Sequence, residues 1–399
     1  MKMNKIVLLK NRGTALPLAL IATVLLLTIG TSILSLGLNG RIYSIRNASD
    51  ISARCAADAG LTKALYEMNQ KLQSKSLFIN YELPTEINTR LSNCDATFDY
   101  TVTKVSDGYV VKATGNAGQA ERTVQCLLRQ QSPFDAAIFT DGSITLHNSG
   151  EVDWYNYDSD DVNFKVATNS TKNGSVSLKN SSLINGDVAV GPGSDPDDVI
   201  SASSGAKIEG ETSSLPEERD LELPTVPFWL QYLPSDGKIK SDTVLYHSGK
   251  YSEIDLKSNN KITVVGDIIL YVTGDLILGN SAELEIAEDS SLTLYLEGDI
   301  ESKNSSKINN ETKIPQNLQI YGLEGCDKMN FKNSSDFYGT IYAPNADIIV
   351  HNSVDIYGSI VSNSFDLRSS GKFWYDASLR DEDFSSVPTT LVVTSWQEY

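Results

Sequence analysis

Cysteine, histidine and net positive charge are all scarce in this sequence, and each shortage excludes a class of protein. Four cysteines in 399 residues cannot form a dense disulfide framework, although one or two bridges remain open. Three histidines leave little material for histidine-based metal or acid–base sites. The net charge of -18 argues against nucleic acid, because a phosphate-binding surface needs clustered lysine and arginine. We therefore expect an acidic, self-repelling exterior and no nucleic-acid partner.

Charge of either sign is absent from a long segment near the N-terminus. No charged residue occurs between Arg12 and Arg41, and Ala15 to Leu38 is mostly Leu, Ile, Ala and Val. This exceeds the roughly 20 residues needed to span a bilayer, whereas a cleaved secretory signal has only about 7–15 apolar residues. Positive residues precede the span at Lys2, Lys5, Lys10 and Arg12. The positive-inside bias predicts a single-pass protein of the cytoplasmic (inner) membrane whose bulk is periplasmic or extracellular.

A proline marks the expected start of the helix. Pro17 would break a helix interior but is tolerated in a first turn, where it would lie if the chain were cut after Gly13. The transmembrane and pilin-like helix predicted for residues 14–75 would then measure about 90 Å, roughly three times the thickness of the hydrocarbon core. A helix that extends so far beyond the bilayer needs partners to pack against.

The N-terminal region carries a family resemblance. The basic leader ending in Gly13, the uncharged span and the stretch ARCAADAGLTKAL (Ala53 to Leu65) resemble PilX-type minor pilins, with Asp58 where that family has Glu. The resemblance implies that prepilin peptidase removes residues 1–13 and that the new N-terminal residue, Thr14, is methylated. It also implies that the helix packs with other pilins or pseudopilins and engages inner-membrane assembly machinery.

The sequence departs from major pilins at the fifth mature position. Leu18 stands where those proteins have a glutamate that pairs with a neighbour's terminal amine inside the apolar filament. An unpaired charge would be costly there. The departure predicts a subunit of the tip or of the initiation complex. Two alternatives stay open, an ordinary secretion signal and a plain anchor in which Gly13 has no role.

Beyond the helix the hydrophobic period changes to two. TFDYTVTKVSDGYVVKATG and AERTVQCLLRQ predict three short antiparallel strands, with the first turn at residues 106–108. We expect residues 76–132 to form a pilin-like head with this β-meander. Cys55, Cys94 and Cys126 fall in this part of the chain and are candidates for a disulfide in an oxidising exterior. Buried free thiols fit the sequence equally well.

An internal repeat dominates residues 133–380. The pattern apolar-x-apolar-x-Asn-Ser-x-x-apolar occurs five times, at Asn148, Asn180, Asn280, Asn333 and Asn352. It describes a strand, a polar corner and a second strand entering one core, which predicts a parallel β-helix, right-handed as such crossovers usually are. Stacking the last two copies places Phe337 on Ile356 and Tyr338 on Tyr357.

Two segments of this region are expected to depart from the repeat. Four prolines within residues 215–234 predict an insertion that runs along the outside of the coil, because proline cannot occupy a central strand. Residues 381–399 are expected to form a C-terminal strand or cap.

The end of the repeat region carries a second resemblance. FYGTIYAPNADIIV, GKFWYDASLR and VVTSWQE are similar to the β-helical C-terminal domain often joined to PilX-type N-termini. In that family a Tyr-Asp-x-x-Leu-Arg segment follows the last turn, as Tyr375, Asp376, Leu379 and Arg380 do here. The predicted fold class is mainly β: an N-terminal α-helix, a small antiparallel meander and a right-handed parallel β-helix.

An enzymatic hypothesis finds little support. Pectin-cleaving β-helices need acidic clusters for calcium and a basic catalyst, and the acidic turns at 158–161 and 195–198 do not match a calcium-loop motif. No G-x-S-x-G, P-loop, H-E-x-x-H or C-x-x-C motif occurs. His147 and His351 stand at equivalent corners where lysine also occurs, which indicates solvated residues. Tyr338 and Tyr357 could bind sugars, but stacking between repeats explains them as well.

Together these patterns predict a minor pilin or pilus assembly protein that displays a β-helix outside the cytoplasm. The alternative is a membrane-anchored surface adhesin or carbohydrate-binding β-helix that never enters a filament. A surface glycan or host surface is the expected external partner in either case. We expect no catalytic residues, metal or cofactor.

Overall fold

The computed structural model describes most of the chain and divides it into two compact units. The described residues are 15–73, 83–105, 108–155, 163–203, 205–332, 335–351, 354–368, 370–380, 382, 384, 387 and 390–399. Unit 1 comprises Met1–Arg129 and Leu391–Tyr399, and unit 2 comprises Gln130–Thr390. The leader with Gly13 and Thr14 lies outside the described residues. Unit 2 is therefore an insertion in the chain of unit 1.

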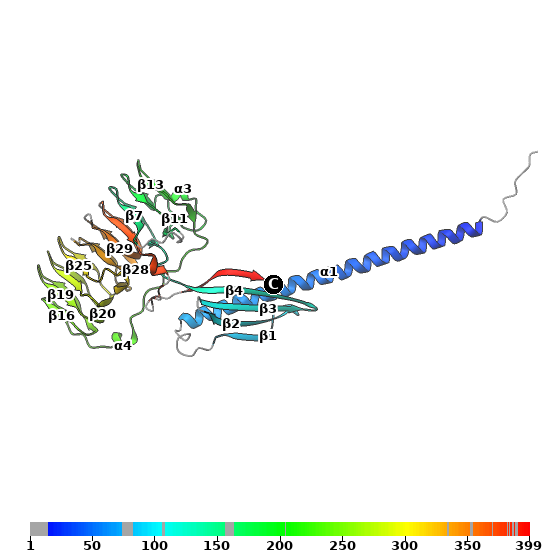
Figure 1. Ribbon diagram of the computed structural model, residues 1–399, viewed down its shortest axis with the longest axis horizontal. Coiled ribbons are helices and arrows are strands. Elements are labelled where there is room, and N and C mark those ends of the chain that lie inside the picture. The colour runs from blue at the N-terminus through cyan, green and yellow to red at the C-terminus, as the bar shows by residue number, and fades with distance from the viewer. Residues whose placement is uncertain are drawn as a thin grey trace, which may run out of the picture. The chain divides into compact units, whose positions relative to one another are not determined.

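Unit 1 consists of one long helix and a five-stranded sheet (Figure 1). Helix α1 spans Ala15–Gln73. The sheet has the order β1-β2-β3-β4-β31. Its strands are β1 (Thr85–Arg90), β2 (Thr97–Val105), β3 (Gly108–Ala117), β4 (Ala120–Gln131) and β31 (Thr390–Glu398). The pairs β1–β2, β2–β3 and β3–β4 are antiparallel, so the predicted meander is present and gains a strand on each side.

The C-terminal strand expected within residues 381–399 is present as β31, and it belongs to unit 1. Thr123 of β4 and Tyr399 exchange backbone hydrogen bonds at 3.4 and 2.9 Å. Leu391 is buried in the core of unit 1, and its N–H donates to Asn69 Oδ1 of α1 at 2.7 Å. Burial of Leu391 and pairing of these backbone groups stabilise the segment in the sheet of unit 1, although the residues just before it in the chain belong to unit 2.

The second part of α1 packs on this sheet through small residues. Ala53, Ala56 and Ala57 are fully buried. A Cβ added at Gly115 of β3 would lie 2.0 Å from the carbonyl oxygen of Ala53 and 2.5 Å from the nitrogen of Ala57. Only glycine permits so close an approach of strand to helix. The alanine-rich stretch that carries the pilin resemblance is therefore the packing face of the helix.

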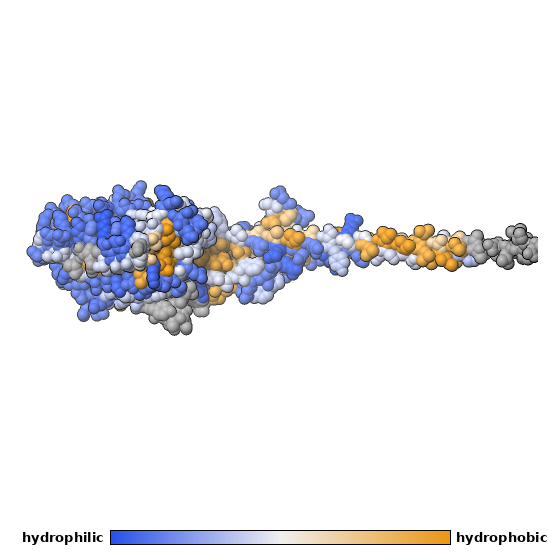
Figure 2. Space-filling model, turned by 90° about the horizontal axis from the view of Figure 1, so that it is seen from above, coloured by the Kyte–Doolittle hydropathy of each residue, from blue (hydrophilic) through white to orange (hydrophobic). Residues whose placement is uncertain are grey.

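The first part of α1 has no such cover. Every described side chain from residue 16 to residue 48 is exposed. Figure 2 shows hydrophobic residues gathered along this part of the helix. Helix α1 is long enough and apolar enough to cross a membrane.

Unit 2 contains parallel strands that pair with strands three places away along the chain. The pairs β5–β8, β6–β9 and β7–β10 are examples. We call the stretch of chain between a strand and the strand stacked on it a rung; in these pairs a rung contains three short strands. The strands before residue 215 are β5 (Ile138–Thr140), β6 (Ile144–Leu146), β7 (Glu151–Trp154), β8 (Lys165–Thr168), β9 (Val176–Leu178), β10 (Leu183–Ile184), β11 (Asp187–Val190), β12 (Ile200–Ala202), β13 (Lys207–Ile208) and β14 (Thr212–Ser214), with the short helix α3 (Pro196–Val199).

A second series of rungs follows the short helix α4 (Phe228–Gln231). It begins with β15 (Lys238–Ile239), β16 (Thr243–Leu245), β17 (Gly249–Tyr251), β18 (Glu253–Leu256), β19 (Lys261–Val264), β20 (Asp267–Val272), β21 (Leu276–Leu278) and β22 (Glu283–Ile286). It continues with β23 (Ser291–Leu296), β24 (Ile300–Ser302), β25 (Lys307–Asn310), β26 (Leu318–Gly322), β27 (Lys328–Phe331), β28 (Phe337–Val350), β29 (Ile356–Leu367) and β30 (Lys372–Tyr375). The 3-10 turns η1 (Pro315–Asn317) and η2 (Ala377–Arg380) complete it.

The register predicted from the repeat is confirmed. Phe337 pairs with Ile356, Tyr338 with Tyr357, and eleven partners link β28 to β29. The inward side chains of all rungs share one buried core. Two of the described asparagine corners are also joined across rungs, since Asn180 Nδ2 donates to Asn148 Oδ1 at 3.1 Å. Asn333 and Asn352 lie outside the described residues.

The order of the rungs does not follow the order of the chain. The first rung (β5–β7) pairs on one side with β8–β10 and on the other with β29 and β30, at the far end of the sequence. We call this junction the seam. The chain thus enters unit 2 within the stack, builds rungs in one direction, and later returns to the seam from the other end. The sequence analysis predicted only the stacking of the last two copies, because the local pattern does not encode which rung meets which.

A connecting segment, the strap (residues 215–237), joins the two series of rungs. It contains the predicted insertion 215–234 and runs over the outside of the strands. Leu230 of the strap is fully buried, and Leu221 and Val226 are partly buried in a second apolar cluster that includes Tyr295 and Tyr342. The strap thus covers an outward apolar column that crosses several rungs.

Phe337→Asp is expected to destabilise unit 2 by roughly 4 kcal/mol or more, because it replaces a core ring with an unpaired buried charge. Phe337 is 3% exposed and pairs with Ile356 in the next rung. Calorimetric unfolding should show the loss. Val244→Asp, at a residue 48% exposed, is the control and should change stability by less than about 0.5 kcal/mol. Equal effects of the two substitutions would contradict the assigned core.

Candidate functional site

The bare part of α1 is the first candidate surface. Leu18, which the pilin resemblance aligns with the glutamate of major pilins, is 69% exposed. The exposed apolar residues continue past the uncharged span, since Ile42, Tyr43 and Ile45 are 46%, 65% and 57% exposed. Because water is a poor environment for such a row of side chains, this helix is suited to lipid and to partner helices.

The four cysteines differ in exposure. All four are described and carry free thiols: Cys55 is exposed, Cys94 is half-buried, and Cys126 and Cys326 are buried. Burial raises the pKa of the Cys126 thiol to about 11 and that of Cys326 to about 12. Both thiols are therefore protonated and unreactive at neutral pH. The disulfide among Cys55, Cys94 and Cys126 stays a prediction.

The structure describes only one of the two acidic turns. The turn at 158–161 lies outside the described residues. In the other, Asp195 caps α3, and its side chain accepts the backbone N–H of Asp197 at 3.1 Å. Within the described ranges no group of three His, Cys, Asp or Glu side chains is arranged to hold a metal ion.

The histidines at the corners have local partners. His147 Nε2 lies 3.2 Å from Asp366 Oδ1 of β29, so this pair crosses the seam. Burial, followed by the charges of Arg368 and Lys332, lowers the pKa of His351. His247 is exposed.

The predicted aromatic row exists, but its rings cover one another. Tyr338 and Tyr357 stack with centroids 4.3 Å apart and planes 8° apart, and Trp374 continues the row 6.1 Å from Tyr357. The Tyr155 ring packs edge to face against the Tyr357 ring, with centroids 4.8 Å apart. Trp374 Nε1 also donates to Asp355 Oδ2 at 3.1 Å. Since the ring faces are occupied by neighbouring rings, this row is suited to holding rungs together rather than to receiving a sugar ring.

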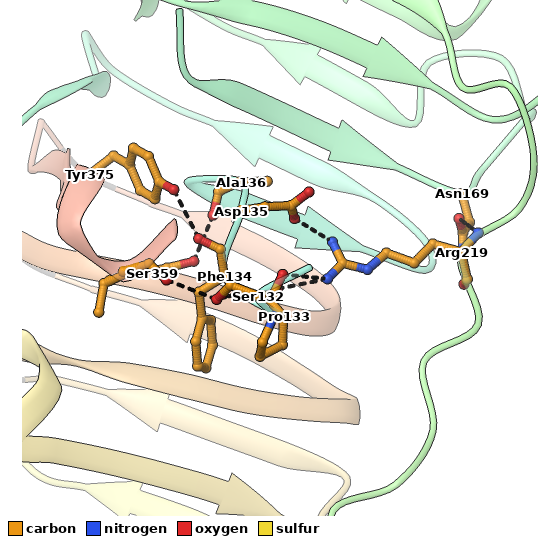
Figure 3. Close-up of polar contacts among 10 residues, drawn as sticks. Ser132, Pro133, Phe134, Asp135, Ala136, Asn169, Arg219, Ser359 and Tyr375 are labelled. Carbon is orange, nitrogen blue, oxygen red and sulfur yellow. Dashed lines mark hydrogen bonds and ion pairs between the residues drawn. The ribbon is translucent and has the colours of Figure 1, made fainter. Parts of the chain in front are cut away.

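The segment by which the chain enters unit 2 is clamped at the seam (Figure 3). Ser359 Oγ of β29 donates to the carbonyl of Ala136 at 2.6 Å. Tyr375 OH of β30 donates to the carbonyl of Phe134 at 2.8 Å. Both bonds are buried, and both join the first residues of unit 2 to its last strands. Leaving a buried carbonyl without its hydrogen-bond donor would cost stability, so these bonds hold the first residues of unit 2 against its last strands.

Arg219 of the strap completes this clamp. Its Nη1 lies 2.7 Å from Asp135 Oδ1, and its Nη2 donates to the carbonyl of Pro133 at 2.9 Å and to that of Ser132 at 3.4 Å. The guanidinium carbon stands 4.7 Å from the ring centroid of Phe139. One side chain thus joins the strap to the incoming segment by charge, hydrogen bonds and ring stacking.

Sequence reasoning missed both Arg219 and a second repeat. Asp275 Oδ1 accepts the backbone N–H of Asp299 at 2.9 Å, and Asp299 Oδ1 accepts that of Lys328 at 2.9 Å. Each aspartate thus satisfies a backbone group of the next rung. The signal was present, because Gly274-Asp275 and Gly298-Asp299 are spaced by one rung. Arg219 had no comparable signal.

Comparison with known proteins yields one family model and distant structural likenesses. Residues 193–382 match a domain of unknown function, DUF7305, which leaves the first rungs outside the match. No curated protein matches this chain. The chain is similar to the competence-associated pilin ComZ from Thermus thermophilus, with 12% identity and a TM-score of 0.32 over 88% of this chain and 97% of that one. It is also similar to an ice binding protein from an Antarctic bacterium, Flavobacteriaceae, with 9% identity and a TM-score of 0.19 over 60% and 96%.

Arg219→Ala is expected to destabilise unit 2 by about 2 kcal/mol, because it removes the ion pair with Asp135 and the guanidinium hydrogen bonds to two backbone carbonyls. Thermal unfolding should show the loss, and amide exchange should rise selectively in residues 132–136. Arg219→Lys should recover part of the stability. The control is Lys207→Ala, since the ion pair of Lys207 with Glu209 is exposed at 72% and 57%. If Arg219→Ala destabilised unit 2 no more than Lys207→Ala does, the proposed clamp would be contradicted.

Proposed function

We propose that this protein is a PilX-type minor pilin of a type IV pilus or a related secretion filament, located at a tip or in an initiation complex. The observation that carries the proposal is the division of α1. One unbroken helix packs on a small antiparallel sheet through residues 53–72 and exposes every described side chain from 16 to 48. That is the arrangement of a subunit that enters an assembly through its helix.

The length of the bare helix favours partners over lipid alone. Its 33 exposed residues extend about 50 Å, whereas a hydrocarbon core is about 30 Å thick. Ile42, Tyr43 and Ile45 lie in the excess and are exposed. We propose that other pilins or pseudopilins cover them, after prepilin peptidase has cut the leader and the inner-membrane assembly machinery has engaged the helix.

We further propose that the rungs of unit 2 form a right-handed β-helix displayed outside the cytoplasmic membrane. Parallel pairing between strands three apart and the single shared core support a coil. The handedness rests on the general preference of parallel crossovers. The proposed role of this coil is non-enzymatic display toward a surface glycan or host surface.

Processing is expected between Gly13 and Thr14. Mass spectrometry of the membrane-extracted protein should find Thr14 as the first residue, carrying a methyl group. Gly13→Val should leave the leader attached, because a branched side chain at the cut would obstruct the peptidase. An intact Met1 in the unsubstituted protein, or a cut beyond Ser32, would refute the pilin proposal.

Immunogold labelling of unit 2 is expected to mark filament ends or the cell envelope sparsely. Leu18 offers no carboxylate to a neighbour's amine, so incorporation along the shaft should be rare. Leu18→Glu should not affect the folding of either unit, since Leu18 is exposed, but should raise labelling along the shaft or disturb initiation. Dense, regular label along unsubstituted filaments would show that the role assigned to Leu18 is wrong.

A further inference from the structure

The strap carries a second set of aromatic residues, and these differ from the stacked row because they face solvent. Phe228, Trp229 and Tyr232 are 77%, 50% and 70% exposed. They belong to α4 and the residue after it, beside β17 and β20 at the lower margin of unit 2 in Figure 1. We call these three residues the strap patch. Exposing three large rings on one turn of chain is unfavourable unless something covers them.

The strap patch is rigid. Leu230, in the middle of α4, is fully buried and anchors the helix to unit 2. Lys250 Nζ donates to the carbonyl of Gln231 at 2.8 Å and fixes the end of the helix. Pro224, Pro227 and Pro234 bracket the segment and restrict its backbone. The backbone that carries the three rings is therefore fixed before any partner arrives, which lowers the entropy lost on binding.

The chemistry of the strap patch is suited to a neutral polyhydroxy ligand. Phe228 and Tyr232 contact each other with centroids 4.6 Å apart and planes tilted by 49°, yet they stay 77% and 70% exposed, so each ring keeps surface open to solvent. Within the described ranges, Trp229 Nε1 and the Tyr232 hydroxyl make no hydrogen bond to protein. Ring faces can receive the C–H face of a sugar, while these polar groups can meet its hydroxyls.

Size and charge argue against other occupants. Three side chains exposed to this degree offer about 400 Å², half of what one partner contributes to a standard protein interface. The chain's net charge of -18 disfavours anionic lipid and nucleic acid. We infer that the strap patch is a saccharide-binding site for neutral glycan chains. This inference rests on the proposed display function only for its biological setting.

The test uses the full-length protein in lipid nanodiscs and three neutral polysaccharides, insoluble cellulose, chitin and amylose. Retention on at least one of them is expected. Phe228→Ala/Trp229→Ala should weaken that retention about tenfold or more, because aromatic side chains dominate such contacts. The control is Tyr66→Ala, a tyrosine of unit 1 that is 62% exposed, and it should bind like the unsubstituted protein. Thermal unfolding of all variants should be unchanged, since these side chains are exposed.

Three outcomes would overturn the inference. The first is the absence of retention on all three polysaccharides, and the second is retention that the double substitution does not weaken. The third is that the substitution instead abolishes self-association in ultracentrifugation, or binding to phosphatidylcholine vesicles, which would assign the strap patch to a second copy or to a membrane. None of these outcomes affects cleavage after Gly13, so a failure here is distinct from a failure of the pilin proposal.

Discussion

Unit 2 depends on backbone hydrogen bonds between strands that are too short to persist alone. Most of its strands contain two to four residues, so each is stable only while a neighbouring rung supplies its partners. The rungs are therefore stable only collectively. The seam is the critical pairing, because it joins residues near 140 to residues near 360 and converts two separate stacks into one. The clamp by Ser359, Tyr375 and Arg219 is concentrated at that junction.

Much of the fold could be predicted from local patterns, and what could not be predicted is non-local. The Asn-Ser repeat gave the register of β28 on β29, because identical side chains stack in parallel rungs and the alternation of strands fixes which residues point inward. The non-sequential order of the rungs could not be read in this way. Every rung presents similar apolar residues to its neighbours, so these residues do not determine which two rungs pair. The pairing of the first rung with β29 and β30 depends instead on the path of the strap between the two series.

The candidate surfaces also differ in how far the sequence predicted them. The exposed apolar helix followed from an uncharged span, since the absence of charge is visible in the sequence. The stacked tyrosines were found, but their use as a structural row became clear only from ring geometry. The strap patch was overlooked because exposure cannot be read from residue type: Leu230 is buried, while Phe228 and Trp229 directly before it are not. A Pro-rich segment with three aromatic residues was the available signal.

The position of β31 has a consequence for the order in which the protein matures. This strand contains the final residues of the sheet that supports α1, yet more than 250 residues of unit 2 separate it from β4. During synthesis the helix and its first four strands emerge early, but the sheet keeps an open edge until the whole of unit 2 has been made. A chain that stops short within unit 2 carries an incomplete support for its own helix. The fold thereby couples the completeness of unit 2 to the integrity of unit 1.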